Sequence, residues 1–312
     1  MKYYIGVDGG GTKTHYALFD EKKQIVAETK TAGSNHENLD GSFDEAADIL
    51  WEGLTDLSAK SGISISDVSF TLMGLAGIDH PFQHDEMCQR LKGFGLKNFA
   101  VYNDGFIVVK AGSESGAAIG LNNGTGTCCN AIDSSGRMLQ LAGLGDFSGD
   151  MGNGHWIAMM AFRAVYDDVY LGIRKTSISA AYYDRFNLKT REQFLGSVSN
   201  IETDRSEPHI MALIDFFFEG LNNGDEACVM INEMMSERSA ALIAAHADSL
   251  KFDGEEIEVV LSGSILTKLP NDVYLDAIKK KVLEKTGKKF KYIKLTKPPV
   301  VGCVNWIMQE YV

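Results

Sequence analysis

The fold is decided by two short stretches rich in glycine and threonine, Asp8-Gly9-Gly10-Gly11-Thr12-Lys13-Thr14 and Asn122-Asn123-Gly124-Thr125-Gly126-Thr127. Each stretch joins two runs with the character of β-strands, which predicts the turn of a hairpin. Glycine has no β-carbon, so consecutive backbone amides in such a turn can converge on an anion, and the threonine hydroxyls add further donors. Together the two turns predict the two halves of one phosphate clamp.

The phosphate clamp assigns roles to particular residues. We expect the phosphates to be bound by Gly10, Gly11, Thr12, Gly124, Thr125 and Gly126. Asp8 would hold Mg²⁺ through water, because Mg²⁺ gives up its water shell reluctantly. The alternative is that both stretches are ordinary hairpin turns, since Asp-Gly and Asn-Gly are strong turn signals.

Two other nucleotide-binding patterns are missing from the sequence. It contains no Gly-x-x-x-x-Gly-Lys-Ser/Thr, and no Gly-x-Gly-x-x-Gly follows a strand and opens a helix. A P-loop enzyme and a Rossmann dehydrogenase are therefore disfavoured.

Composition narrows the class of protein further. The chain has 312 residues, 45% of them hydrophobic, which is enough for two domains with their own cores. Its formal net charge of −12 repels nucleic-acid phosphates and anionic lipid, so we expect neither a nucleic acid nor a membrane as partner. The five cysteines form no Cys-x-x-Cys pair, and no apolar signal region opens the sequence. We therefore expect a cytoplasmic protein.

The order of the predicted elements repeats along the chain. Strands over residues 3–7, 14–19 and 24–28 precede a helix from about Ser42 to Lys60, and strands then alternate with helices. After residue 116 come strands over 117–121, 127–132 and 138–141, a long helical region over 152–247 and a strand over 256–261. This order predicts an α/β protein whose two similar domains face a central cleft. We place the first domain at residues 1–113 plus 300–312 and the second at 114–299.

These motifs resemble those of the actin-like ATPase and sugar kinase superfamily, and within it the family that joins N-acetylglucosamine kinases with reductase-activator ATPases. Residues 8–12 match the first phosphate motif of the family and residues 124–127 match the second. The run Val259-Val260-Leu261-Ser262-Gly263-Ser264 resembles the strand and turn that cup adenosine, and residues 299–304 resemble the closing helix. The resemblance covers nearly the whole chain and implies two ribonuclease H-like (actin-like ATPase) domains facing a central cleft.

The resemblance also implies the remaining site residues. Gly263 and Ser264 would contact the nucleotide, with Gly224 at a helix start beside the adenine. An amino sugar would be bound by Asn35, His36, Asp104, Thr125, Gly143, Leu144 and Asp150. Asp104 would also be the catalytic base that accepts the proton of the attacking hydroxyl. From its sequence position alone, Asp104 could instead cap the helix that follows it, and Gly77 and Asp79 are further candidates at the cleft.

The family holds both sugar kinases and iron-sulfur ATPases that activate partner enzymes. The activators carry Asp-Ile-Gly-Gly-Gln-Asp as their second phosphate motif, which this chain lacks. Cys128 and Cys129 are adjacent on a predicted strand, so they point to opposite faces and cannot both ligate one cluster. Two departures from the kinase pattern leave the identity of the sugar open: Met151 follows Asp150, and Leu144 replaces an aromatic residue.

From the resemblance we expect an ATP-dependent amino-sugar kinase that uses Mg²⁺, acts on the 6-hydroxyl of N-acetylglucosamine and forms a homodimer. Phosphorylation of N-acetylmuramic acid or glucosamine is a close alternative. An ATPase that activates a partner enzyme, and a sugar sensor without catalysis, are the alternatives from other functional classes.

Overall fold

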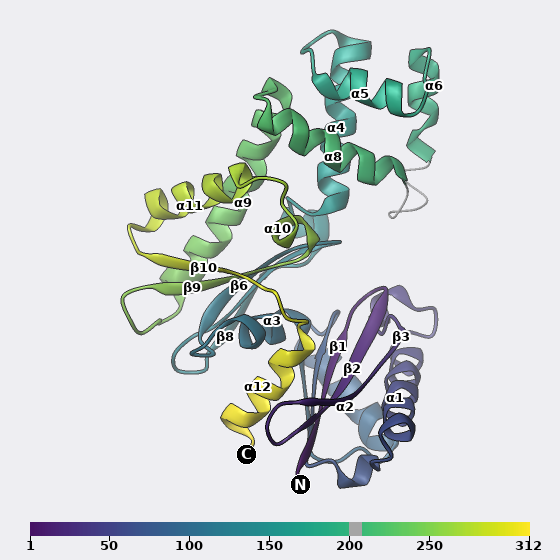
Figure 1. The fold of residues 1–312 in the computed structure, drawn as a ribbon, viewed down its shortest axis with the longest axis vertical. Helices are drawn as coiled ribbons and strands as arrows, with labels where there is room; N and C mark the ends of the chain where they lie inside the picture. The colour runs from purple at the N-terminus through teal and green to yellow at the C-terminus, as the bar shows by residue number, and fades with distance from the viewer. Residues whose placement is uncertain (200–207) are drawn as a thin grey trace.

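The computed structural model describes residues 1–199 and 208–312, and within them the chain forms two five-stranded sheets of the same design (Figure 1). The order of the first sheet is β3-β2-β1-β4-β5, and that of the second is β8-β7-β6-β9-β10. In both sheets the first three strands along the chain pair antiparallel and the next two join in parallel. The predicted repeat and the α/β class are confirmed.

The first lobe, as we call the first sheet with its covering helices, follows the prediction within a few residues. Its strands are β1 (Tyr3–Gly9), β2 (Lys13–Asp20), β3 (Ile25–Ala32), β4 (Phe70–Leu75) and β5 (Phe99–Asn103). Its helical segments are η1 (His36–Asn38), α1 (Ser42–Ser61), η2 (Ile65–Asp67), α2 (Pro81–Gly93) and α3 (Asp104–Gly112).

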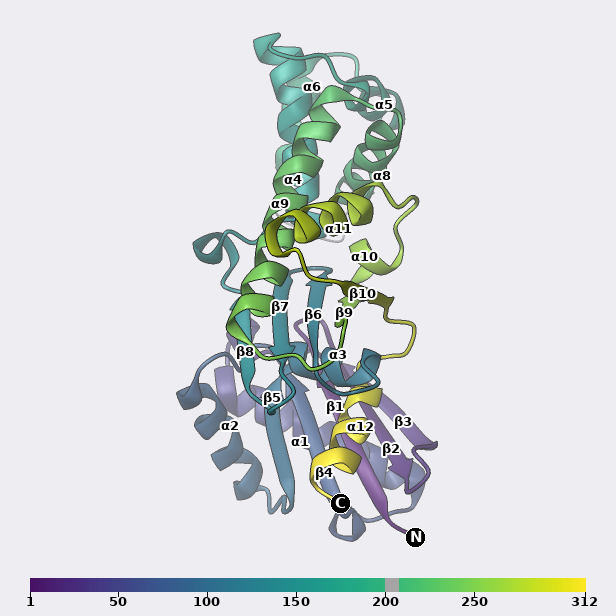
Figure 2. The ribbon, with the colours of Figure 1, turned by 90° about the vertical axis from the view of Figure 1, so that its left-hand side faces the viewer.

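The second lobe contains the second sheet and many more helices. Its strands are β6 (Ala118–Asn123), β7 (Thr127–Ile132), β8 (Met138–Ala142), β9 (Ile257–Ser262) and β10 (Phe290–Lys294). Between β8 and β9 lie η3 (Gly145–Ser148), α4 (Gly154–Tyr166), the π-helical turn η4 (Asp167–Leu171), α5 (Ser177–Arg185), α6 (Arg191–Gly196), α8 (Pro208–Asn222) and α9 (Glu226–Ser249). The second lobe is completed by α10 (Ser264–Thr267) and α11 (Val273–Thr286), and the chain then returns to the first lobe in α12 (Val300–Glu310). In Figures 1 and 2, α5 and α6 lie at the end of the second lobe farthest from the first.

Each sheet has helices on both faces, because side chains that alternate along a strand are buried on either side. Along β1, Tyr4 packs with α3 and α12, whereas Ile5 packs with α1 and α2. Along β9, Val260 joins the cluster around α3 and α12, whereas Val259 packs with α9 and α11. The helices α3 and α12 therefore share one apolar cluster with both sheets.

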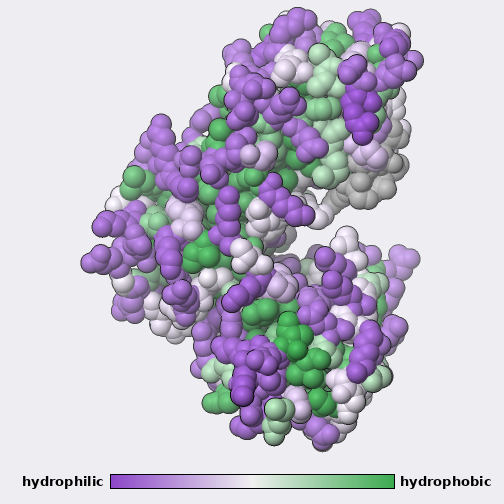
Figure 3. Space-filling view, viewed as in Figure 1, coloured by the Kyte–Doolittle hydropathy of each residue, from purple (hydrophilic) through white to green (hydrophobic). Residues whose placement is uncertain are grey.

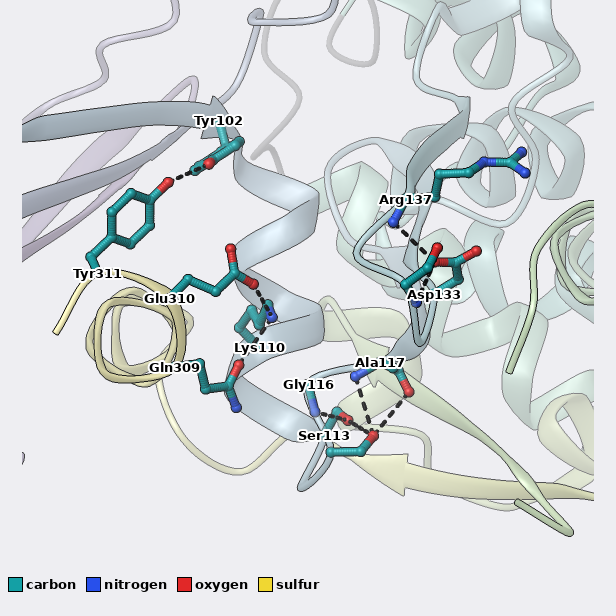
Figure 4. A network of polar contacts seen from close by, with 12 residues as sticks. Tyr102, Lys110, Ser113, Gly116, Ala117, Asp133, Arg137, Gln309, Glu310 and Tyr311 are labelled. Atoms are coloured by element: carbon teal, nitrogen blue, oxygen red, sulfur yellow. Dashed lines mark hydrogen bonds and ion pairs between the residues drawn. The ribbon is translucent and has the colours of Figure 1, made fainter. Parts of the chain in front are cut away.

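Polar contacts hold α12 against the first lobe (Figure 4). The buried Lys110 amine in α3 donates to Gln309 Oε1 at 3.0 Å and forms an ion pair with Glu310 at 3.1 Å. The hydroxyls of Tyr102 in β5 and Tyr311 lie 2.6 Å apart. Both ends of the chain consequently lie in the first lobe, as Figure 1 shows. The exact division into residues 1–113 plus 300–312 and 114–299 stays a prediction.

None of the helices formed by residues 1–199 and 208–312 is both long enough and apolar enough to cross a membrane.

Candidate active site

The molecule is hollowed between its two lobes (Figure 3). Three aspartates of the first lobe lie at or just after the carboxyl ends of neighbouring strands: Asp8 near the end of β1, Asp79 after β4 and Asp104 directly after β5. The strands β1, β4 and β5 are parallel, so their carboxyl ends meet at one edge of the sheet, which is where open α/β sheets bind ligands. The structure thus groups three carboxylates at one edge of the first sheet.

These carboxylates influence one another. Burial raises the pKa of Asp104 to about 7, and the charges of Asp8 and Asp79 add to this increase. Burial also raises the pKa of Asp8 to about 6, while the nearby Lys13 opposes the increase. A carboxylate whose pKa lies near neutrality is well matched to accepting a proton from a substrate.

Asp104 is held by the junction of β5 and α3. The N-cap of α3 is Asn103, whose side-chain oxygen accepts from the backbone N–H of Gly105 at 2.9 Å. The alternative that Asp104 itself caps this helix is wrong, because Asp104 is the first residue inside α3. Its carboxylate therefore leaves the strand at a position fixed by the cap, without serving as that cap.

Both predicted phosphate turns form, and a glycine of another segment packs against each. At the first, the Gly10 N–H donates to Lys13 O at 3.0 Å, and a β-carbon on Gly33 would lie 2.3 Å from Gly11 O. At the second, the Gly124 N–H donates to Gly126 O at 3.0 Å. The Gly10 and Gly124 amides thus close their own turns in this structure.

The tips of both turns are open to solvent. Gly11, Thr12, Thr125 and Gly126 are exposed. A β-carbon on Gly263 would lie 2.2 Å from Asn123 O, so the turn after β9 fits against the second hairpin only without a side chain. The exposed tips carry backbone amides and threonine hydroxyls, which are the donors that phosphate oxygens require.

A cavity of about 690 Å³ adjoins the second hairpin. Its apolar lining includes Ile214 and Phe218 of α8 and Ile265 of α10. Polar groups at Gly124, Thr125 and Ser264 also line it. A volume of this size with an apolar lining and a few polar groups suits a nucleoside. The predicted Ser264 lines the cavity, whereas Gly263 supports the hairpin beside it.

Gly224 lies outside the lining of the cavity, which reaches Asn222 at the end of α8. Its neighbour Asp225 caps α9 by accepting from the backbone N–H groups of Ala227 and Cys228, so the predicted helix start is present. The role of Gly224 in nucleotide binding stays a prediction, and in this structure the α8 side chains are the nearer candidates.

The predicted sugar residues of the first lobe lie together near the cleft. Asn35 Oδ1 accepts from the backbone N–H of Glu37 at 3.0 Å and lies where a β-carbon on Gly77 would be 2.3 Å away. The His36 ring is buried and stacks on Phe43 with ring centroids 3.8 Å apart. Burial lowers the pKa of His36, which favours the neutral imidazole. Asn35 thus also serves as the N-cap of η1.

Three of the predicted sugar residues of the second lobe, Gly143, Leu144 and Asp150, lie in the loop between β8 and α4, whereas Thr125 lies at the exposed tip of the hairpin between β6 and β7. Asp150 accepts from the backbone N–H groups of Gly143 at 3.0 Å and Gly145 at 2.9 Å, and from Ser148 Oγ at 2.7 Å. Leu144 is exposed. In this structure Asp150 orders its own loop, and any contact with a sugar would be additional to these three hydrogen bonds.

Gly143 connects this loop to the carboxylates. A β-carbon at Gly143 would lie 3.3 Å from Gln140 Nε2 and 3.7 Å from Cys128 Cβ. Gln140 Nε2 donates to Asp79 Oδ1 at 2.5 Å, and so the second lobe reaches the first. Cys129, by contrast, is fully buried on the other face of β7 and packs with apolar residues, as predicted for a pair that cannot share one cluster.

Asp8 fits the predicted Mg²⁺ by its chemistry. Among residues 1–199 and 208–312 no three His, Cys, Asp or Glu side chains are grouped to hold a metal ion by themselves. Mg²⁺ commonly binds one or two carboxylates together with substrate phosphates and water. Asp8 lies beside the first phosphate turn with its pKa raised by burial, so a cation there would stabilise its charged form.

Sequence reasoning missed two groups of residues. The wall formed by α8 was hidden in a long helical region whose internal boundaries the sequence does not reveal. Asn130 and Gln140, which contact the first lobe, were also missed. Asn130 is a fully buried amide between Cys129 and Ala131 on β7, and a polar residue inside such an apolar run is the signal that could have identified it.

Comparison with known proteins agrees with this geometry. A sequence profile of the BadF/BadG/BcrA/BcrD ATPase family matches residues 5–304. An N-acetylmuramic acid/N-acetylglucosamine kinase of Clostridium acetobutylicum is 24% identical over 305 residues, which cover 97% of each chain. An N-acetyl-D-glucosamine kinase of Dictyostelium discoideum is 25% identical over 296 residues, which cover 90% of each chain.

The fold is similar to that of a candidate N-acetylglucosamine kinase of Chromobacterium violaceum, whose crystal structure is known. The TM-score is 0.68 at 18% sequence identity, and the match covers 97% of this chain and 98% of the other. At this identity the likeness concerns the fold.

Proposed function

We propose that this chain, which belongs to the BadF/BadG/BcrA/BcrD ATPase family, is a sugar kinase that transfers the γ-phosphate of ATP to the 6-hydroxyl of N-acetylglucosamine. The proposal rests mainly on the position and the environment of Asp104. Its carboxylate follows β5 at the edge that faces the second lobe, and burial together with Asp8 and Asp79 raises its pKa to about 7. The similarity to curated amino-sugar kinases over nearly the whole chain supports the same reaction class.

In the proposed reaction ATP lies with its nucleoside in the cavity beside α8 and its phosphates between the two glycine turns. Mg²⁺ near Asp8 would supply charge neutralisation at the β- and γ-phosphates. Asn35 and the loop around Gly143 would orient the sugar through hydrogen bonds, which discriminate between hydroxyl patterns better than apolar contacts do.

Asp104 would accept the proton of the sugar hydroxyl as that oxygen forms its bond to the γ-phosphorus. The bond between this phosphorus and the β,γ-bridging oxygen breaks, and ADP leaves with the electron pair. Closure of the two lobes would exclude water, so that the γ-phosphate passes to the sugar instead of being hydrolysed.

N-acetylmuramic acid is the second candidate acceptor. The Clostridium acetobutylicum relative is named as a kinase of both amino sugars. The exposed Leu144 lies in the loop proposed to meet the sugar and offers no bulky aromatic barrier to a larger substituent. The acceptor is therefore best identified by comparing both sugars directly.

The test is ADP formation from Mg-ATP with N-acetylglucosamine, N-acetylmuramic acid, glucosamine, glucose or no sugar. We expect ADP release to depend on one of the N-acetylated sugars. Equal release with and without sugar would replace the proposal with an ATPase that serves a partner enzyme. Sugar binding without ADP release would indicate a sensor.

A further inference from the structure

We propose that Asp79 is a positioning residue that joins the two lobes and fixes the start of α3, where Asp104 lies. The catalytic part of this proposal rests on the proposed kinase function. The joining of the lobes stands on geometry alone.

Four side chains form a closed ring of hydrogen bonds across the lobes. Asp79 Oδ1 accepts from Asn103 Nδ2 at 2.9 Å and from Gln140 Nε2 at 2.5 Å. Asn130 Nδ2 donates to Asn103 Oδ1 at 3.1 Å and to Gln140 Oε1 at 3.4 Å. Asp79 and Asn103 belong to the first lobe, and the other two belong to β7 and β8 of the second. The ring therefore spans the base of the cleft.

The ring is fixed by burial on both sides. Asn103 is 6% exposed and Asn130 is fully buried, so their amides depend on partners within the protein. A β-carbon on Gly105 would lie 2.3 Å from Asn130 Oδ1, which shows how closely the second lobe approaches the first turn of α3. A shift of Asp79 would leave the Nδ2 of the buried Asn103 unpaired, and this would cost free energy.

The same ring contains the cap of the catalytic helix. Asn103 Oδ1 accepts from the Gly105 N–H while its Nδ2 donates to Asp79. The rotamer that caps α3 is therefore selected by Asp79, and the next residue along the chain is Asp104. Because a misplacement of about 1 Å can cost a large factor in rate, an intact ring would matter for turnover more than for binding of either substrate.

Asp79 accepts both hydrogen bonds through a single oxygen, so two variants can separate the loss of its charge from the loss of its hydrogen bonds. In Asp79→Asn the amide oxygen can accept both hydrogen bonds, so the ring persists without the charge. In Asp79→Ala both bonds are lost. Asp85→Ala removes a neighbouring carboxylate that is 81% exposed, and it serves as the matched control.

Measured at about pH 8.5, where Asp104 is ionised, Asp79→Ala should lower kcat roughly 10- to 100-fold with KM for ATP nearly unchanged. Asp79→Asn should stay within about threefold of the wild type, and Asp85→Ala should be unchanged. A kcat of Asp79→Ala equal to that of the wild type would overturn the positioning role. So would an Asp79→Asn variant as impaired as Asp79→Ala.

Exchanging the carboxylate and the amide between residues 79 and 140 tests whether the hydrogen bond between these side chains couples the two lobes. Gln140→Glu sets two carboxylates against each other and should lower both kcat and the melting temperature. Adding Asp79→Asn lets the new amide donate to the new carboxylate, so the double variant should recover most of both losses. If the two substitutions act independently in both measurements, the ring does not couple the lobes.

The melting temperatures of the wild type, the two single variants and the double variant test the link between the lobes independently of the proposed kinase function. If the wild type forms no sugar phosphate while the swap still restores the melting temperature, the kinase assignment fails and the link between the lobes holds. If the wild type is an active kinase and the swap restores neither property, the kinase assignment holds and the link fails.

Discussion

The two glycine hairpins occupy equivalent places in the two sheets, yet they carry different charges. Asp8 pairs with His15 across the first hairpin in the way that Asn122 pairs with Cys128 across the second. Burial raises the pKa of Asp8 to about 6, which is the behaviour of a carboxylate short of compensating cations. Asn122 Oδ1, in contrast, accepts from Ser262 Oγ at 3.1 Å and secures the turn after β9.

This difference indicates that the two similar lobes have different functions. The first lobe presents the carboxylates that would handle a cation and a proton. The second presents an uncharged turn beside an apolar cavity, to which the inserted helix α8 contributes a wall. A repeated fold has thus been specialised by one residue in the turn and by one helical insertion.

The largest effect should come from removing Asp104, the proposed proton acceptor of the first lobe. Asp104→Asn removes the group that would accept the proton, so we expect turnover to fall by roughly two decades or more. Because the substitution keeps the shape of the side chain, ATP should still bind. Steady-state kinetics and nucleotide titration would measure the two properties. Turnover close to that of the wild type would remove Asp104 from the mechanism.

Making the first hairpin resemble the second should have the next largest effect. Asp8→Asn places an amide where Asn122 has one in the second lobe, and we expect kcat to fall roughly 10- to 100-fold, with a higher Mg²⁺ concentration needed for half-maximal rate. A magnesium titration at saturating ATP would measure this. An unchanged magnesium requirement would contradict the assignment of the cation to the first hairpin.

A change in the second lobe should affect the nucleotide alone. Phe218 lines the cavity, and Phe218→Leu removes part of its apolar surface, so KM for ATP should rise roughly fivefold while KM for the sugar stays constant. The matched variant in the first lobe is Asn35→Ala, which should raise KM for the sugar roughly tenfold and leave ATP unaffected. Crossed effects would mean that the two lobes do not divide the substrates in this way.

The smallest effect concerns stability and its dependence on pH. The pKa of Asp104 rises from 3.8 to about 7 on folding, so between these values the folded state binds more protons than the unfolded state. The contribution of this group to stability is therefore lost as pH rises through that window. At about pH 8, Asp104→Asn should therefore have a melting temperature on the order of a few degrees above that of the wild type. At about pH 4 the two proteins should melt at nearly the same temperature.

Thermal unfolding of the wild type and Asp104→Asn over this pH range, without nucleotide or magnesium, would test the sign. A variant that melts lower than the wild type at about pH 8 would contradict it.

The sequence was most informative where local chemistry decides the structure. The turns at 8–14 and 122–127 carry their own glycines, and the apolar runs that flank them are strands because both sheet faces are covered. The helix start at Pro81 and the turn from β9 into α10 follow from proline and glycine in the same local way.

Contacts between distant segments could not be predicted in this way. Nothing local to Asn130 indicates that it meets Asn103, and nothing in α8 indicates that it lines the same cavity as Ser264. The function of Asp150 as the organiser of its own loop also depends on the fold of residues 143–150, which no periodic pattern reveals.

The most direct test of the central claim is the stoichiometry and position of phosphoryl transfer. The protein would be incubated with Mg-ATP and N-acetylglucosamine, and ADP and sugar phosphate would be quantified in the same reaction, with the phosphorylated carbon assigned by NMR. We predict equal amounts of ADP and N-acetylglucosamine 6-phosphate. ADP without sugar phosphate, or phosphate on the anomeric oxygen, would contradict it.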